Sequence, residues 1–135
     1  MVKAVCLDTR ILSAFLKKKE SAKNIIDDFK DKEHEIYTTT INITEIFMGL
    51  FKINLVSEEK IKTLKEFFLA LHPRTIDYDI CVLSGKLYAS ILRGKEIGWR
   101  DTFIAAITLL NGKKIITSNP EHFKRISELE VIEYY

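Results

Sequence analysis

Cysteine is scarce in this sequence: two residues in a chain of 135 exclude a protein built on a disulfide framework. Neither Cys6 nor Cys81 belongs to a C-x-x-C pair of the kind that binds zinc. Cys6 lies in an apolar strand-like run and Cys81 in an apolar helical stretch, so we expect both to be small buried hydrophobic residues. Chains of this composition suit a reducing compartment, and the cytoplasm is the expected location.

Proline and glycine are also rare, with two and five residues, which leaves no room for a low-complexity linker. We therefore expect a single domain over residues 1–135. No stretch approaches the roughly 18 consecutive apolar residues that a transmembrane helix requires, so no membrane association is expected. The start of the chain lacks the pattern of a secretory signal.

A strong charge of either sign is missing as well. The 21 basic and 19 acidic residues leave a formal net charge of +2, far from the basic character of a dedicated duplex-DNA binder. This balance neither requires nor excludes another nucleic acid as a partner. Short lysine groups, as at residues 17–19 and 113–114, are explained by solvated helix faces and loop ends.

Two kinds of apolar pattern alternate along the chain. Runs rich in β-branched and aromatic residues predict strands at residues 2–7, 35–39, 74–76, 114–117 and 131–134. Helical spacing predicts helices near residues 9–16, 21–29, 42–50, 57–71, 78–93, 101–110 and 120–126, with a loop at 94–99. Ser21 and Ser57 are candidate helix N-caps. Strands separated by helices predict an α/β fold with a central, mainly parallel sheet flanked by helices.

Three acidic residues do not fit the pattern of exposed helix positions. Asp8 directly follows the first buried strand, and ligands in parallel α/β sheets bind beside the carboxyl ends of strands. Glu45 borders the apolar stripe of its helix, where an unpaired charge would be costly. Asp101 precedes the most apolar helix of the chain. Each has an ordinary alternative: Asp8 and Asp101 as helix N-caps, and Glu45 as a residue favoured by the helix dipole.

Considered together, the three acids indicate a metal site. If the sheet is parallel, the strand before Asp8 ends at the edge where the helices of Glu45 and Asp101 begin. Three converging carboxylates would repel one another, and a divalent cation relieves that repulsion. Oxygen ligands favour Mg²⁺ or Mn²⁺ over zinc, and such an ion can activate water for phosphodiester hydrolysis. The arrangement therefore predicts metal-assisted hydrolysis.

Four segments carry a resemblance to a known family. They are Leu7-Asp8-Thr9-Arg10-Ile11-Leu12, Thr44-Glu45-Ile46-Phe47-Met48-Gly49, the segment from Trp99 through Asp101 to Ala106, and the segment from Ile116 to Phe123. Each is a weak motif alone, but their order and spacing span nearly the whole chain. The sequence resembles the PIN-domain family, and especially the VapC-type toxins of toxin–antitoxin modules.

The resemblance implies a PIN-like three-layer α/β/α fold and a ribonuclease that uses Mg²⁺ or Mn²⁺. It also implies RNA as substrate, a homodimer, and inhibition by a small antitoxin protein. Asp8, Glu45 and Asp101 match the family's near-constant acids, and Thr117 falls where the family often has a Ser or Thr near the metal.

Two positions depart from the family's pattern. Arg10 stands where asparagine is common, and Asn119 stands where many members carry a fourth aspartate. Asparagine can bind a metal or a water but adds no charge, so we expect at most one tightly bound metal ion before RNA arrives. Glu121 could supply the missing carboxylate, although an exposed glutamate in a first helical turn is the simpler interpretation. Candidate RNA contacts are Arg10, Arg100 and Lys124 for phosphates, and Trp99 for stacking on a base, with a core or dimer contact as the alternative for Trp99.

Other functions remain open at this stage. Asp8-Thr9 after a first strand also suggests a haloacid-dehalogenase-type phosphatase, but that mechanism needs an aspartate where Arg10 stands. A nucleotide-binding domain would need a glycine-rich loop after the first strand. The main alternative is a catalytically weak or inactive PIN-like module that binds RNA or protein.

Overall fold

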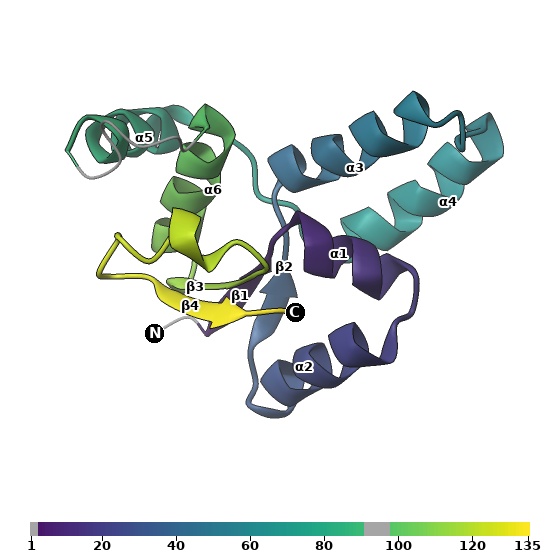
Figure 1. Ribbon diagram of the computed structural model, residues 1–135, viewed down its shortest axis with the longest axis horizontal. Helices are drawn as coiled ribbons and strands as arrows, with labels where there is room; N and C mark the ends of the chain where they lie inside the picture. The colour runs from purple at the N-terminus through teal and green to yellow at the C-terminus, as the bar shows by residue number, and fades with distance from the viewer. Residues whose placement is uncertain (1–2, 91–97) are drawn as a thin grey trace.

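The computed structural model describes residues 3–90 and 98–135, and its centre is a four-stranded sheet (Figure 1). The strands are β1 (Ala4–Leu7), β2 (Glu35–Tyr37), β3 (Lys114–Thr117) and β4 (Glu130–Glu133). They lie in the order β2-β1-β3-β4, and all three pairings between them are parallel within the described residues. The predicted α/β fold with a parallel central sheet is confirmed.

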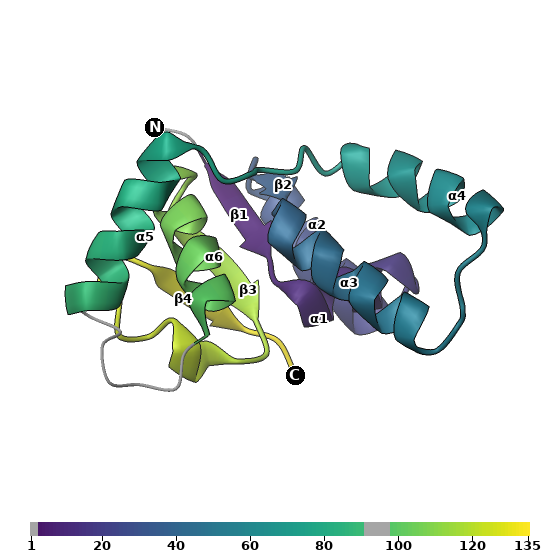
Figure 2. The same cartoon turned by 90° about the horizontal axis from the view of Figure 1, so that it is seen from above.

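Helices cover both faces of this sheet. They are α1 (Thr9–Leu16), α2 (Glu20–Asp31), α3 (Thr40–Lys52), α4 (Glu58–Leu69), α5 (Tyr78–Ser90) and α6 (Trp99–Leu110). Figure 2 shows α5 and α6 on one side of the strands and α1 to α3 on the other. None of the described helices combines the length and apolar character needed to cross a bilayer.

The central strand β1 separates two apolar cores. Ala4 and Cys6 pack into the core formed with α5 and α6, whereas Val5 and Leu7 pack into the core formed with α1 to α4. All four side chains are fully buried. This is why β1 has a continuous apolar run rather than an alternating pattern. The run ends at Asp8, where the chain leaves the sheet.

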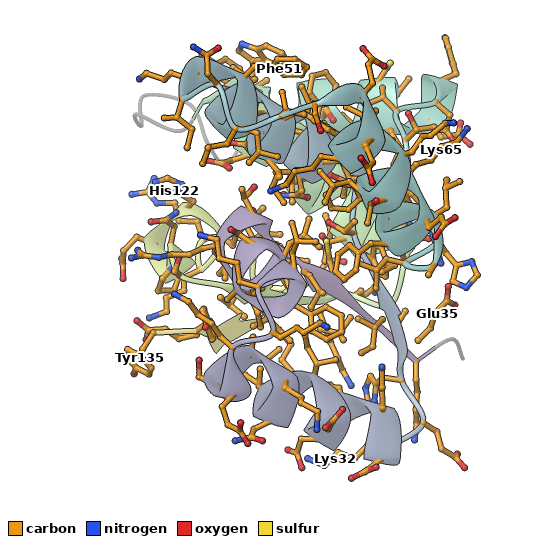
Figure 3. All side chains as sticks on the ribbon, turned by 90° about the vertical axis from the view of Figure 1, so that its right-hand side faces the viewer. Lys32, Glu35, Phe51, Lys65, His122 and Tyr135 are labelled. Atoms are coloured by element: carbon orange, nitrogen blue, oxygen red, sulfur yellow. The ribbon has the colours of Figure 1, made fainter. Side chains whose placement is uncertain are left out.

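Helices α3 and α4 form a hairpin that extends away from the sheet (Figure 1). Ser57 caps α4 as predicted, because its hydroxyl accepts a hydrogen bond from the Lys60 amide at 3.2 Å. The far end of the hairpin exposes large apolar side chains, including Phe51, which Figure 3 labels. An apolar groove of about 770 Å³ lies between the hairpin and α1, and its apolar lining residues are Leu16, Ile46, Leu50, Ile53 and Leu64.

Some element boundaries differ from the sequence-based expectations. Helix α2 begins at Glu20 rather than with Ser21 as its cap, and the Ser21 hydroxyl shares a hydrogen bond of 2.9 Å with the Tyr134 hydroxyl. The strand expected at residues 74–76 is reduced to a single bridge between Thr39 and Arg74. The helix expected at residues 120–126 is one 3-10 turn, Pro120–His122.

The prediction that Cys81 is buried is wrong, whereas the prediction for Cys6 is confirmed. Helix α5 buries the face that carries Ile80, Ser84 and Leu87, and Cys81 therefore lies on an exposed part of the helix. The last residues of the helix expected at 78–93 and most of the loop expected at 94–99 lie outside the described residues.

Candidate active site

Asp8 stands at the carboxyl end of β1, and its carboxylate faces β3 and α3. It occupies the N-cap position of α1, but its side chain makes no capping hydrogen bond. Instead Asn42 Nδ2 donates to Oδ1 at 2.8 Å, and the Thr117 hydroxyl donates to Oδ2 at 2.6 Å. The side chain is buried. Asp8 is therefore a buried carboxylate held by two side chains, and the capping alternative is wrong.

Glu45 approaches the same sheet edge from α3. The Thr9 hydroxyl donates to its Oε1 at 2.9 Å, and the Arg100 guanidinium lies 3.9 Å from its Oε2. Burial raises the pKa of Glu45; the Thr9 hydrogen bond lowers it, nearby Asp8 and Asp101 raise it, and Arg100 lowers it. The net pKa is above the usual value, so the ionised form is disfavoured at this position.

Asp101 comes from the first turn of α6, whose N-cap is Gly98, so the interpretation of Asp101 as a cap is wrong. Its Oδ2 lies 2.8 Å from Nδ1 of His122, which comes from the 3-10 turn after β3. Burial and the charge of Asp8 raise the pKa of Asp101, and the contact with His122 offsets part of this. The net pKa of Asp101 is therefore above its usual value, as it is for Glu45.

The three acids open onto one hollow of about 440 Å³ at the carboxyl edge of the sheet. Its lining consists of Asp8, Thr9, Arg10, Ser13, Glu45, Asp101, Ser118, Asn119 and His122. The predicted convergence of Asp8, Glu45 and Asp101 is therefore present in the structure. Residues from three distant parts of the chain meet there because β1, α3 and α6 all reach the same edge.

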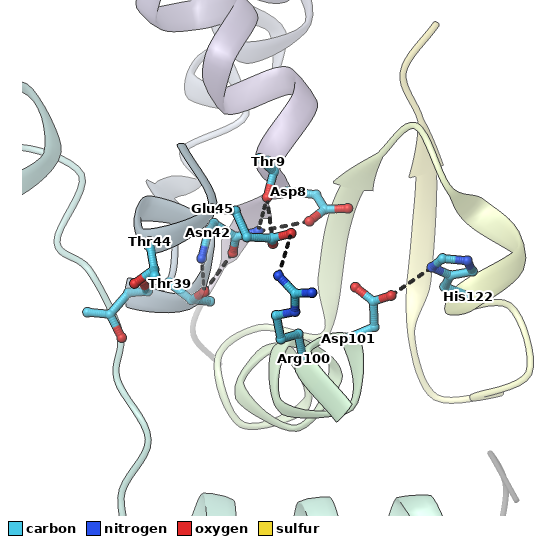
Figure 4. A network of polar contacts seen from close by, with 10 residues as sticks. Asp8, Thr9, Thr39, Asn42, Thr44, Glu45, Arg100, Asp101 and His122 are labelled. Carbon is cyan, nitrogen blue, oxygen red and sulfur yellow. Dashed lines mark hydrogen bonds and ion pairs between the residues drawn. The ribbon is translucent and has the colours of Figure 1, made fainter. Parts of the chain in front are cut away.

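The chemistry of the hollow fits an oxygen-preferring cation, although the side chains are not arranged around one. Among the residues that the structure describes, no three Asp, Glu, His or Cys side chains are grouped as ligands of a single ion. Each acid is turned to its own protein donor, as Figure 4 shows. Burial, and after it the neighbouring carboxylates, nevertheless raise the pKa values of Glu45 and Asp101, and a cation beside them would favour their ionised forms. Asp8, Glu45 and Asp101 would hold such an ion.

Thr117 and Asn119 lie next to the acids, as expected. Thr117 is fully buried at the end of β3, and its hydroxyl donates to Asp8 and accepts a hydrogen bond of 3.0 Å from the Asn119 amide. Asn119 is exposed and lines the hollow. Glu121 does not replace a fourth acid, because its side chain is 83% exposed and faces Lys124 at 3.8 Å.

The candidate RNA contacts are divided between the hollow and its surroundings. Arg10 is exposed and lines the hollow, and Arg100 reaches it through its pair with Glu45. Trp99 is 64% exposed on the first turn of α6, where its ring packs edge-on against Phe103, so a core role is excluded. Lys124 lies outside the lining of the hollow.

Three site residues were missed by sequence reasoning: Thr9, Asn42 and His122. Thr9 and Asn42 are short polar residues near helix starts, where capping is the ordinary explanation. His122 follows a proline in a short exposed-looking segment, and no spacing links it to Asp101. Asn42 did carry a usable signal, since it lies one helical turn before Glu45 on the same helix.

Solved structures match this fold over almost its full length. A chain of VapBC2 from Rickettsia felis, solved bound to a DNA fragment from its promoter, matches with a TM-score of 0.74 and 24% identity, covering 98% of this chain and 99% of that one. VapBC-1 from nontypeable Haemophilus influenzae gives a TM-score of 0.76 at 23% identity, with 96% and 97% covered. DNA-bound VapBC from Salmonella typhimurium gives 0.77 at 22% identity, with 98% of both chains covered.

These identities are low, so the structural matches bear on the fold alone. A comparison with proteins of curated function gave no match. The sequence itself matches the PIN domain over residues 5–129, which includes every acid of the hollow. This chain therefore belongs to the PIN-domain family.

Proposed function

We propose that this protein is the toxin ribonuclease of a toxin–antitoxin module and that it hydrolyses RNA with Mg²⁺ or Mn²⁺. The observation that carries the proposal is the convergence of Asp8, Glu45 and Asp101 on one hollow, at a cost in charge repulsion. Membership of the PIN-domain family supports nuclease chemistry at this position. The solved VapBC relatives support the toxin assignment.

The bound cation would supply a water of lowered pKa and would stabilise the charge that develops on the phosphate. The protein's own residues perform the remaining tasks. Asp8, Glu45 and Asp101 bind the ion, while Thr117 and Asn42 hold the Asp8 carboxylate between them. Arg10, at the rim of the hollow, and Arg100 are placed to bind phosphate oxygens of the RNA. Exposed Trp99 offers a surface on which a base can stack.

Cleavage of a labelled single-stranded RNA tests the nuclease proposal. Wild type with Mg²⁺ or Mn²⁺ should cleave, EDTA should abolish cleavage, and Asp8→Asn should reduce it by at least about a hundredfold, since a ligand charge is lost. Glu121→Gln is the matched control, because it removes an exposed acid outside the hollow and should retain wild-type activity. Cleavage that survives both EDTA and Asp8→Asn would contradict the mechanism. Metal-dependent RNA binding without cleavage would favour the inactive-module alternative.

An antitoxin partner is the second part of the proposal. A toxin–antitoxin complex from Klebsiella pneumoniae also matches this fold, and this chain has an apolar groove between α1 and the α3–α4 hairpin. The groove shares Thr9, Ser13 and Glu45 with the acidic hollow, so a segment bound along it would reach the active site. Co-expression with the protein of the adjacent reading frame should give a complex that no longer cleaves RNA. Leu50→Arg, on the groove lining, should weaken that complex.

Homodimerisation is proposed from the family resemblance. The apolar residues at the end of α4 could serve the core or an interface: Phe68 and Leu71 are buried in the core beside α1 and α3, and Phe67 packs against it while partly exposed. Light scattering of the purified protein measures its oligomeric state directly. A monomeric mass at micromolar concentration would contradict the proposed homodimer.

A further inference from the structure

Asn42 is a polar side chain in a place that ordinarily holds an apolar one. It lies in the first turn of α3, it is fully buried, and Ile46 one turn later packs in the core. A buried primary amide is tolerated only when its donors and acceptor are satisfied. The partners of Asn42 therefore indicate its role.

The amide of Asn42 is anchored at one end by the cap of its own helix. The Thr39 hydroxyl donates to Asn42 Oδ1 at 2.6 Å and accepts from the Asn42 backbone amide at 3.1 Å. This reciprocal pair fixes the oxygen end of the side chain and leaves its NH₂ group for other partners. Capping alone would need neither of the two NH₂ hydrogen bonds.

Both NH₂ donors are directed to the acidic hollow. One goes to Asp8 Oδ1 at 2.8 Å and the other to the Thr9 hydroxyl oxygen at 2.9 Å. Because Thr9 accepts from Asn42, its own hydrogen is free to go to Glu45 Oε1 at 2.9 Å. The hydrogen bonds thus run in one direction, from Thr39 through Asn42 to two carboxylates (Figure 4).

We infer that Asn42 is a positioning residue that orients two metal-binding acids at once, Asp8 directly and Glu45 through Thr9. The inference rests on the proposed function and deepens it. A carboxylate has about four lone-pair positions, so one oxygen held by the protein leaves others for a cation. Partners of this kind hold metal ligands in place, and their loss weakens metal binding by about ten- to a hundredfold.

Mn²⁺ titration by isothermal calorimetry, with metal alone and no RNA, tests the inference. Asn42→Leu keeps the branched shape of the side chain but removes every side-chain hydrogen bond, and it should weaken Mn²⁺ binding by at least about tenfold. Thr9→Val breaks the chain from Asn42 to Glu45 but leaves the hydrogen bond from Asn42 to Asp8, so it should weaken binding by a smaller factor. In the double variant, the fold-loss of Mn²⁺ affinity should be smaller than the product of the two single losses, because both substitutions act on one chain of hydrogen bonds.

The matched control is Thr108→Val, which loses one hydrogen bond from an equally buried side chain near the opposite end of α6. It should bind Mn²⁺ like wild type. Each variant is titrated at a temperature where circular dichroism shows it folded. Excess Mn²⁺ should also restore RNA cleavage to Asn42→Leu, which a general loss of structure would not allow.

The outcomes separate this inference from the proposed function. If wild type binds Mn²⁺ and folded Asn42→Leu binds it equally well, the positioning role is wrong and the metal centre stands. If Asn42→Leu does not fold, Thr9→Val decides, and unchanged binding by that variant overturns the inference. If wild type binds no Mn²⁺, the metal centre and the positioning role fail together.

Discussion

Two glutamate–arginine pairs at opposite edges of the sheet differ in how completely their charges are matched. At the amino edge, Glu35 accepts a hydrogen bond of 2.8 Å from Arg74, whose guanidinium also donates to Asn111 Oδ1 and lies over the Tyr37 ring. At the carboxyl edge, Glu45 and Arg100 are 3.9 Å apart. Figure 3 shows Glu35 and His122, which marks the carboxyl edge, on opposite sides of the molecule.

The difference separates a structural pair from a functional one. Arg74 is fully engaged by groups that hold the segment after α4 against the sheet. Arg100 meets one of three acids and leaves the pKa of both Glu45 and Asp101 raised. In an edge with a purely structural role, we would expect each carboxylate to be paired with a cation or replaced by an uncharged residue. The acids of the carboxyl edge are therefore only partly matched by Arg100 and His122, which is consistent with the cation site proposed there.

The largest expected effect on metal-free stability comes from breaking the amino-edge pair. Arg74→Ala removes charged hydrogen bonds and a cation–π contact from a side chain that is 26% exposed. The free energy of unfolding should fall by about 2–3 kcal/mol. Lys32→Ala is the control, because Lys32 forms only an exposed pair with Asp28 and its loss should change stability by less than about 0.5 kcal/mol. Urea unfolding measures both, and equal effects would mean that the Arg74 pair contributes no more to stability than an exposed ion pair.

Cation binding should stabilise the carboxyl edge by a similar amount. Mn²⁺ at a hundred times its dissociation constant should add about 2.7 kcal/mol to the unfolding free energy of wild type. Asp101→Asn should lose most of this gain, and Glu121→Gln, which lies outside the hollow, should keep it. The melting temperature with and without Mn²⁺ measures the effect. Equal gains in wild type and Asp101→Asn would show that Asp101 is not a ligand.

The sequence predicted the acids of the carboxyl edge better than it predicted the side chains that contact and hold them. Asp8, Glu45 and Asp101 could be identified because each borders an apolar run or stripe and because parallel strands end at a common edge. The sheet was predictable for the same reason, since β1 and β3 are short apolar runs between helices. Their meeting at one hollow follows from topology alone.

The side chains that hold the acids reach them through tertiary contacts, which no local sequence pattern encodes. Asn42 and Thr9 are separated by 33 residues and His122 and Asp101 by 21, and each pair forms only after the strands align. The exposure of Cys81 was missed for a related reason: α5 buries the face that carries Ile80, Ser84 and Leu87, and an apolar helix sequence does not reveal which face is covered. The strand expected at residues 74–76 is reduced to a bridge, because Arg74 pairs with Thr39, which lies beyond the end of β2.

A smaller effect should follow from removing the cation that competes at the carboxyl edge. Arg100→Gln takes a positive charge from a partly exposed pair, so metal-free stability should change by less than about 0.5 kcal/mol. Mn²⁺ binding should tighten by about threefold, because the ion no longer meets a like charge beside Glu45. Calorimetric titration without RNA measures this, and weaker binding by Arg100→Gln would mean that Arg100 orients Glu45 rather than competes for it.

The smallest effect concerns Glu45 itself in the metal-free protein. Its pKa is raised in the folded state above the ordinary value of 4.5, so ionised Glu45 opposes folding at neutral pH. Glu45→Gln should therefore raise stability near pH 7 by a few tenths of a kcal/mol, a modest value because the side chain is 31% exposed. As pH falls through the folded pKa, wild-type Glu45 gains a proton and the difference shrinks, vanishing below the unfolded pKa. Glu66→Gln, on the exposed face of α4, is the control and should leave the stability at pH 7 unchanged. If Glu45→Gln lowered stability at pH 7, the Arg100 and Thr9 contacts would outweigh repulsion and burial, and the carboxyl edge would resemble the amino edge after all.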